Sequence, residues 1–519
     1  MGQLRFEAVG SVRLALAEAT RTDDSSADRV ANRYIELRPG MTEKLGARRH
    51  HLLTGRRGTG KSTLLHVVRK RLVDGGIAVA SVDMERFKGR EFPDVLIEIL
   101  ISLLKEIRPP RRARDLILDW SFRGKVGQLA WELTQSLSNP QSVRLRVDRK
   151  AKSEKRAWLQ LGAENKSNPL RGSAVISGGR LSQSTTSSEA EFEVLKMDIL
   201  QQLAPKIADI LSELVKRSPE QRAIVFIDDY YFVGLEDQPR VLDYLHQVCK
   251  GTGVWLKIGG VKSRLNPYAE GNPPKGMQLG QDMDLLELDI TLDAFATAKH
   301  FLEKMLDGVL GDLHVTANSL FSETAGNRMV LACGGAVARD CITLTDAALD
   351  ETLERMGKKN TYKAGALVSI SSEDVQRAAL KRLNSKEDDE LSIDAGSDAP
   401  AVKARWRDIC DFTSQSAGGN AFVLVKLSDL DGTTWGKEIQ QLESMRLLHR
   451  IKDTVPNTPK WRGIKTMVFM VDLAQVAGQR LRTAIPDFWS GTAEFDRLRR
   501  AEWVYSPDWR ANHVKKSQI

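Results

Sequence analysis

The chain has only four cysteines in 519 residues, and their spacing argues against two classes of protein. Cys249, Cys333, Cys341 and Cys410 lie far apart and form no C-x-x-C pair. A disulfide framework or a zinc site is therefore not expected, and a reducing cytosol fits this cysteine usage. The eight histidines form no metal-ligand pattern either.

Long apolar runs are also missing. No segment of about 18 consecutive apolar residues occurs, so no membrane span is expected. The best candidate, Val95–Ile107, contains Glu98, Lys105 and Glu106 and is better interpreted as an amphipathic helix. The N-terminus has no apolar core of the signal-peptide type, and we expect a cytoplasmic protein without membrane contact. No G-x-S-x-G elbow supports Ser/His/Asp catalysis.

The bulk composition is that of a soluble globular protein. Hydrophobic residues make up 41% and charged residues 28% of the chain. The length predicts roughly two to four domains. The net charge of +9 is modest for this length, so the distribution of charge is more informative than its sum.

One octet is the most informative motif of the chain. Residues Gly55–Ser62 read G-R-R-G-T-G-K-S, which fits the phosphate-binding pattern G-x-x-x-x-G-K-[ST]. The glycines allow a tight turn that aims backbone N–H groups at phosphate oxygens, Lys61 reaches the β- and γ-phosphates, and the Ser62 hydroxyl can ligate Mg²⁺. The predicted nucleotide-contacting residues are Gly55, Arg56, Arg57, Gly58, Thr59, Gly60, Lys61, Ser62 and Thr63.

The context of the octet supports this interpretation. Residues 50–54 are a short, mostly apolar run before it, and Ser62–Leu72 has the apolar spacing of a helix after it. Strand, glycine loop and helix is the required order, because the helix N-terminus also attracts phosphate. The sequence therefore predicts a site for ATP and Mg²⁺ rather than a glycine-rich turn with an incidental lysine.

Further apolar segments complete an alternating pattern. Strands are expected at 77–83, 223–229, 254–260 and 284–290, with helices at 92–107 and 191–217. With residues 50–54, these give five strands in a βα layout, which predicts an α/β fold with a parallel sheet. Residues 108–188 interrupt the pattern and form the most basic region. Within this insertion we expect a basic β-hairpin over 143–161 and a loop over 167–188.

The C-terminal part predicts further domains. Residues 291–384 are helical, 385–404 form an acidic linker, and 405–519 contain helices followed by strands at 447–452 and 465–472. Two strands around a basic loop after helices are typical of a winged helix. We therefore predict a P-loop domain over 1–290 with the insertion 108–188, a helical lid, the linker and a winged-helix-like domain.

The strand at 223–229 ends in two acids that suit phosphate chemistry. Asp228 can hold Mg²⁺, and Asp229 can orient or deprotonate an attacking water. An acid next to the metal-binding acid marks the additional-strand branch of P-loop proteins. The alternative is a strand that merely ends in an Asp-Asp cap.

Cationic residues at two places are candidate nucleotide sensors. Lys262 and Arg264 follow the strand at 254–260, where either could sense the γ-phosphate, and Arg339 lies in the segment Gly334–Asp340. At this segment the chain resembles origin-recognition-type AAA+ ATPases, in which an arginine at the start of a lid helix reaches the nucleotide. The resemblance implies that role for Arg339, and it also covers the octet, the acid pair, the lid and the C-terminal domain. The alternatives are a solvated basic loop for Lys262 and Arg264, and an exposed Arg339 that pairs with Asp340.

Position 229 departs from the AAA+ pattern. Many AAA+ proteins carry Glu there, and Asp is one methylene shorter, so slow, switch-like hydrolysis is a hypothesis. Residues 228–231 and Gln238-Pro239 also look similar to bacterial ATP-binding proteins, which implies a role in bacterial genome or anti-phage defence.

These observations lead to two function hypotheses. The first is an AAA+ type ATPase that forms homo-oligomers and acts on or with DNA through the basic insertion and the C-terminal domain, where Trp435–Lys452 contains a candidate recognition helix. Its catalytic residues would be Lys61, Asp229, Arg264 and Arg339. The alternative is a nucleotide-gated assembly switch with little turnover that binds a partner effector protein.

Overall fold

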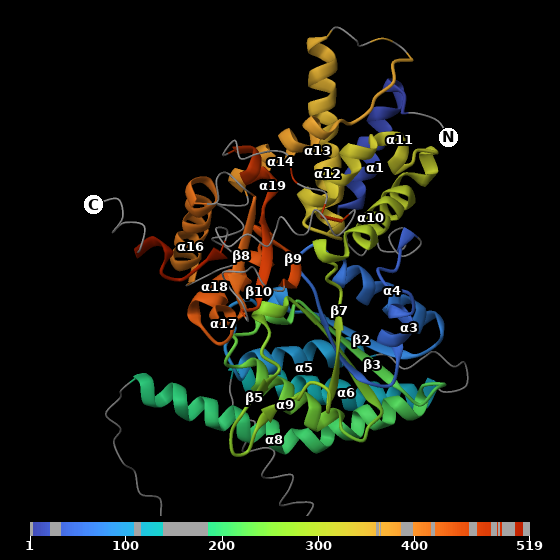
Figure 1. The fold of residues 1–519 in the computed structure, drawn as a ribbon. Coiled ribbons are helices and arrows are strands. Elements are labelled where there is room, and N and C mark those ends of the chain that lie inside the picture. The colour runs from blue at the N-terminus through green and yellow to red at the C-terminus, as the bar shows by residue number, and fades with distance from the viewer. Residues whose placement is uncertain are drawn as a thin grey trace, which may run out of the picture.

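The computed structural model describes most of the chain (Figure 1). The described residues are 4–20, 33–107, 116–138, 185–359, 363, 365–385, 398–416, 421–455, 464–478, 485, 488–489 and 504–511. No helix within these ranges is long and apolar enough to cross a lipid bilayer.

A five-stranded sheet forms the centre of the N-terminal half, and every pair of neighbouring strands is parallel. The order across the sheet is β2-β3-β4-β1-β7. The strands are β1 (His50–Thr54), β2 (Ala78–Asp83), β3 (Ala223–Asp228), β4 (Val254–Gly260) and β7 (Met283–Glu287). Because β4 lies between β1 and β3, one strand separates the phosphate-loop strand from the strand that ends in the acid pair. The predicted α/β fold with a five-stranded parallel sheet is confirmed.

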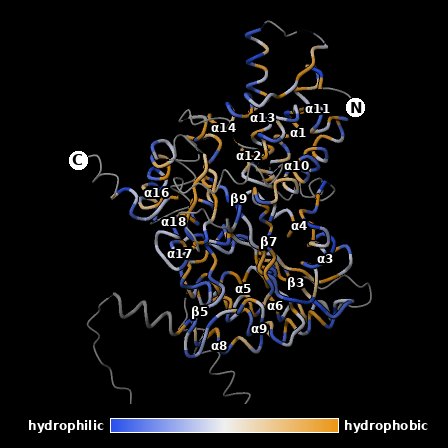
Figure 2. Tube along the Cα trace, in the orientation of Figure 1, coloured by the Kyte–Doolittle hydropathy of each residue, from blue (hydrophilic) through white to orange (hydrophobic). Residues whose placement is uncertain are grey.

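Helices cover both faces of this sheet and divide its core in two. Alternate residues of a strand point to opposite faces, so Leu53 packs with Leu64 of the helix after the octet while Leu52 packs on the other side. Figure 2 shows apolar stretches along the trace in the middle of the molecule near β7. The helices of this half are α3 (Met41–Gly46), α4 (Lys61–Asp74), α5 (Asp94–Glu106), α6 (Leu116–Ser138), α8 (Thr185–Arg217) and α9 (Gln238–Cys249).

A helical lid follows the sheet, as predicted. It comprises α10 (Phe295–Leu310), α11 (Ala317–Leu320), α12 (Glu323–Cys333), α13 (Ala338–Lys358) and α14 (Ser372–Ser385). A left-handed glycine, Gly334 with φ 63°, ends α12 and starts the turn into α13. The N-terminal helix α1 (Val9–Ala19) packs against α10 and α13, so this segment of the predicted domain 1–290 lies with the lid instead of the sheet.

The C-terminal domain has the element order of a winged helix. A helix, a strand, two helices and two antiparallel strands follow one another, and the first strand pairs with the last. These elements are α16 (Ala399–Asp411), β8 (Phe422–Lys426), α17 (Leu427–Leu430), α18 (Thr434–Ser444), β9 (Leu448–Val455) and β10 (Thr466–Val471). The segments α19 (Leu473–Gly478) and β11 (Val504–Tyr505) complete the domain, and its strands share a continuous core with the lid.

Some sequence expectations differ from the structure. Residues 116–138 of the insertion form α6, which packs on α5 through Phe122 and Leu133, because apolar residues at helical spacing outweigh the basic composition. The last residues of the expected loop at 167–188 begin α8, and residues 399–404 of the expected linker begin α16. The expected hairpin at 143–161 lies outside the described residues, as does most of the loop at 167–188.

Candidate nucleotide-binding site

The octet forms a glycine loop between β1 and α4. Gly58 and Gly60 adopt φ angles of 83° and 91°, where a side chain would be strained. A Cβ atom at Gly58 would also lie 2.9 Å from the Cβ of Arg339. The Lys61 Nζ donates to the carbonyl oxygens of Gly55 and Arg56 at 3.0 and 3.1 Å. The lysine therefore curls over its own loop, and α4 begins at that residue with its N-terminal N–H groups facing the same space.

The acid pair lies beside the start of α4. The Ser62 side chain hydrogen-bonds to Asp228, and the backbone N–H of Asp229 donates to the Asp228 Oδ1 at 2.9 Å. Burial raises the pKa of both carboxyl groups, and the neighbouring Asp228 charge helps to raise the pKa of Asp229 to about 6. Asp229 has a left-handed φ of 52°, which is uncommon outside glycine.

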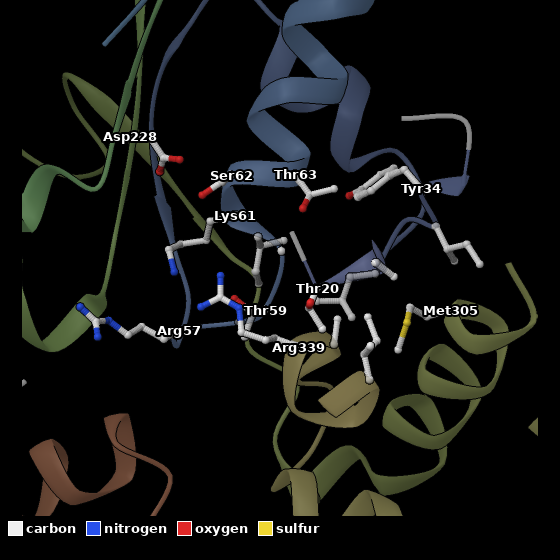
Figure 3. A pocket seen from close by; sticks show the side chains of 18 of the residues that line it. Thr20, Tyr34, Arg57, Thr59, Lys61, Ser62, Thr63, Asp228, Met305 and Arg339 are labelled. Carbon is white, nitrogen blue, oxygen red and sulfur yellow. The ribbon is translucent and has the colours of Figure 1, made fainter. Parts of the chain in front are cut away.

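A cavity of about 740 Å³ joins these groups to an apolar wall. The loop residues 57–63, Asp83, Asp228 and Asp229 line one end. Figure 3 shows Tyr34 and Met305 on the far side of the cavity from Asp228 and Arg57. The apolar wall comprises Tyr34, Ile35, Leu37, Phe301, Met305, Val309 and Ile342. A polar end that presents N–H donors and an apolar end match the two halves of a nucleotide.

The sequence reasoning missed the apolar end and one acid. Residues 33–37 precede the octet with no motif, and the wall residues 301–309 lie on the lid helix α10. Asp83 ends β2 directly opposite Asp228 in the sheet register and also lines the cavity. The available signal for Asp83 was its position at the carboxyl end of a parallel strand.

Arg339 lies beside the glycine loop. Its backbone N–H donates to the carbonyl oxygen of Gly58 at 3.1 Å, and its side chain lines the cavity. The adjacent Asp340 is fully buried and accepts hydrogen bonds from Arg382 at 2.8 Å and Arg446 at 3.0 Å. The first turn of the lid helix α13 thus contacts the glycine loop directly.

Arg264 is not among the cavity-lining residues. Its guanidinium lies 4.7 Å from the centre of the Tyr231 ring, and that ring lines the cavity. Lys262, the other candidate, forms an ion pair with Glu287 at the end of β7. The structure therefore places Arg264 behind Tyr231 instead of beside Lys61.

The C-terminal domain contacts the glycine loop through Arg446. This residue follows α18, is almost completely buried and has a left-handed φ of 63°. Its Nη1 donates to the carbonyl oxygen of Arg57 at 3.1 Å as well as to Asp340. The Ser444 hydroxyl also donates to the Ser263 hydroxyl at 2.8 Å. The domain that contains α18 is therefore joined to the glycine loop and to the segment that follows β4.

The oxygen donors at this end suit a hard cation. The Ser62 hydroxyl and the Asp228 carboxylate are hydrogen-bonded to each other, and oxygen ligands of this kind are those that Mg²⁺ prefers. Across the described ranges, no cluster of three or more His, Cys, Asp or Glu side chains could hold a metal by itself. A magnesium ion that shares its coordination with phosphate and water needs few protein ligands, so the residues present fit this ion.

Comparisons with known proteins give little further information. No family model and no curated protein matches the chain. Among solved structures, it is similar to the Aeropyrum pernix ORC1 protein in complex with DNA, at 11% identity and a TM-score of 0.33, over 90% of this chain and 95% of that chain. It is also similar to Cdc6p from Pyrobaculum aerophilum, at 10% identity and a TM-score of 0.30, over 89% and 99% of the two chains. The Aeropyrum pernix ORC2 protein in its ADP form gives 12% identity and a TM-score of 0.30, over 86% and 96%.

Proposed function

We propose that this protein binds and hydrolyses ATP with Mg²⁺ as an AAA+ type ATPase. One observation carries the proposal: a single cavity combines the glycine loop, Lys61 and the Asp228-Asp229 pair at one end with an apolar wall at the other. The phosphates would lie at the N-terminus of α4, where N–H donors and a cation stabilise negative charge. The base would lie against Ile35, Met305 and their neighbours.

Each polar group has a task in this reaction. Ser62 and Asp228 would hold Mg²⁺, which neutralises phosphate charge when it is bound. Asp229 would accept the proton of a water that forms a bond to the terminal phosphorus. The bond between that phosphorus and the bridging oxygen breaks, and ADP leaves with the electron pair. Lys61 and Arg339 would stabilise charge on the transferred group.

The pKa of Asp229 suits this task. A general base works best when its pKa lies close to the working pH, and burial beside Asp228 raises the pKa of Asp229 to about 6. At neutral pH the carboxylate is ionised and more basic than a solvated aspartate. The shorter side chain of Asp compared with Glu would hold the water differently, which supports slow hydrolysis as part of the proposal.

We further propose that the protein acts with DNA as a homo-oligomer. The C-terminal elements follow the winged-helix order, and the chain has a net charge of +9. Phosphate neutralisation by Lys and Arg gives affinity that falls steeply with salt. A role in bacterial genome or anti-phage defence and a cytoplasmic location belong to the same proposal, on the sequence features given above.

A nucleotide-gated switch with little turnover is the second candidate. The contact of Arg446 with Arg57 and Asp340 favours it, because that contact joins the C-terminal domain to the loop that phosphate would reshape. A partner protein bound to the C-terminal domain would then sense the nucleotide through a defined polar network.

One assay separates the two candidates. Phosphate release is measured with and without duplex DNA at low and high salt, and the assembly state is measured by light scattering with ATP. Strong stimulation by DNA that disappears at high salt supports the DNA-associated ATPase. Stable ATP-dependent assemblies with negligible phosphate release support the switch. A protein that neither binds ATP nor assembles would contradict both candidates.

A further inference from the structure

The ring of Tyr231, which lines the cavity, has two arginines close to it. The guanidinium of Arg264 lies 4.7 Å from the centre of its ring, and that of Arg57 lies 5.7 Å away. The Arg57 Nη2 also reaches the tyrosine hydroxyl at 3.4 Å. Arginine is attracted to the face of an aromatic ring, and the attraction grows when the group is shielded from water. Tyr231 is only 7% exposed, so this contact is well shielded.

The ring itself is held from several sides. It packs at 4.7 Å against the Phe232 ring, and it lies on the short helical turn that directly follows Asp229. The backbone of Arg264 is fixed by buried Gln238, whose Nε2 donates to the Arg264 carbonyl oxygen and whose Oε1 accepts from the Asn266 N–H. A rigid ring restricts an arginine that stacks on it, so less conformational freedom is lost when that arginine contacts a ligand.

Arg57 lies at the polar end of the cavity. It belongs to the glycine loop and lines the cavity together with Lys61, Asp228 and Asp229. Figure 3 shows it at the opposite end from Met305 and on the other side of Lys61 from Arg339. Its charge acts on Asp229, since it helps to lower the pKa that burial raises. A nucleotide with its base on the apolar wall would direct its terminal phosphate toward this side chain.

We propose that Arg57 is a catalytic arginine that acts in cis on the terminal phosphate, and that Tyr231 is the residue that positions it. This inference rests on the proposed ATP hydrolysis. Arg264 lies against the same ring and does not line the cavity, so we assign it a supporting role in place of the direct sensor role expected from the sequence. The planar guanidinium presents several N–H donors to phosphate oxygens, where negative charge spreads as the terminal bond breaks.

The placement of Tyr231 links this arginine to the water-activating acid. Asp229 and Tyr231 are two residues apart at the end of β3, so a shift of the strand end moves both. The arginine and the base are therefore set by one short segment. An arginine supplied by the same chain also removes the need for a neighbouring subunit to complete the site, so each chain can hydrolyse ATP by itself.

Variants of Arg57 test the catalytic role. Arg57→Ala is expected to lower kcat by roughly 100-fold or more, as loss of a charge-stabilising arginine does, while the Kd for ATP changes little. The exchange keeps the backbone carbonyl that Arg446 contacts, so it isolates the side chain. Arg57→Lys restores the charge without the planar fork and is expected to recover only part of the rate. Arg240→Ala is the matched control, because Arg240 stacks 3.8 Å over Phe92 and does not line the cavity.

Variants of Tyr231 test the positioning role. Tyr231→Leu removes the aromatic face, and kcat is expected to fall about tenfold or more with an unchanged Kd for ATP. Tyr231→Phe keeps the face and is expected to restore most of the rate. If the two variants lowered kcat equally, or if both weakened ATP binding instead of turnover, Tyr231 would not act through Arg57. Melting temperatures measured alongside show whether each variant is folded.

A mixing experiment separates action in cis from action in trans. Arg57→Ala and Asp229→Asn chains are combined in equal amounts after each is shown to bind ATP. If Arg57 acts in cis, the mixture stays as inactive as its components, because neither chain has a complete site. Recovery of hydrolysis would show that Arg57 acts on a neighbouring subunit and would overturn the proposal.

The inference can fail separately from the proposed function. Absence of ATP binding or hydrolysis by the unmodified protein would contradict the proposed function and, with it, the inference. If the unmodified protein and Arg57→Ala hydrolyse ATP equally fast, the proposed function stands and the inference alone is overturned.

Discussion

The two ends of the cavity are built in different ways. The polar end comes from one continuous segment, 57–63, and from the acids at the ends of two neighbouring strands. The apolar end comes from the N-terminal segment 33–37, the lid helix α10 and Ile342 of α13. The polar end is therefore fixed by the sheet, whereas the apolar end exists only when the lid and the N-terminal segment are folded against it.

This difference separates the end of the cavity that suits the reaction from the end that suits the coupling of ligand binding to conformational change. A rigid sheet edge suits charge stabilisation, because preorganised donors need not rearrange during the reaction. An end assembled from separate segments suits conformational change, because ligand binding can shift those segments relative to one another. Arg446 and Asp340 connect the two regions, since they tie the lid and the C-terminal domain to the glycine loop. The predictions below treat the two ends separately.

The largest effect is expected at the polar end from Asp229→Asn. Loss of the base should lower phosphate release by roughly 10²–10⁴-fold while ATP binding is retained. The same exchange should raise the melting temperature of the nucleotide-free protein at neutral pH. The folded-state pKa of about 6 lies above the ordinary value of 3.8, so ionisation of this carboxyl opposes folding as pH rises through 6. Equal loss of binding and turnover would mean that Asp229 holds the nucleotide and not the water.

The pH dependence of hydrolysis should come from the polar end alone. Because Asp229 must be ionised to accept a proton, kcat should be constant well above pH 6 and fall about tenfold for each pH unit below it. Affinity at the apolar end should not follow the same curve, and titrations of ADP across this range can test that. A kcat that stayed flat down to pH 4.5 would exclude Asp229 as the base.

Changes at the apolar end should affect affinity and leave chemistry nearly intact. Met305→Ala removes apolar contact with the base and should weaken ATP binding by roughly 3- to 30-fold, with kcat little changed. Leu380→Ala is the control, because Leu380 is exposed on α14 outside the cavity. A fall in kcat without any change in Kd would contradict the division between the two ends.

The parts of the fold and site that depend on local sequence were predictable. The strand His50–Thr54 matches its expected bounds, and the glycine loop and the Asp228-Asp229 pair could be recognised from short segments with characteristic spacing. The structure of these segments depends on residues that are close together in the sequence, so a short sequence pattern is enough to predict both their structure and their chemical groups. The order of the C-terminal helices and strands was predictable for the same reason, although strand β8 was not.

Contacts between distant segments could not be predicted. Asp340 accepts hydrogen bonds from Arg382 and Arg446, which follow it by 42 and 106 positions. The sequence suggested only its neighbour Arg339 as a partner. Lys257 gives a second case. It is fully buried in the central strand β4, where its Nζ donates to the carbonyl oxygens of Ala47 and Arg49 and contacts the His51 ring. Burial of a charge requires such partners, and only the tertiary fold supplies them.

The most direct test of the central claim is a titration of the protein with ATP and Mg²⁺ by calorimetry. Lys61→Ala and Lys105→Ala are compared with the unmodified protein, since Lys61 lies in the cavity and Lys105 is exposed on α5. We expect saturable binding at one site per chain, unchanged in Lys105→Ala and weakened by at least about 100-fold in Lys61→Ala, because a buried charge-assisted contact with phosphate is lost. Equal affinity of all three proteins for ATP would show that the nucleotide does not occupy this cavity.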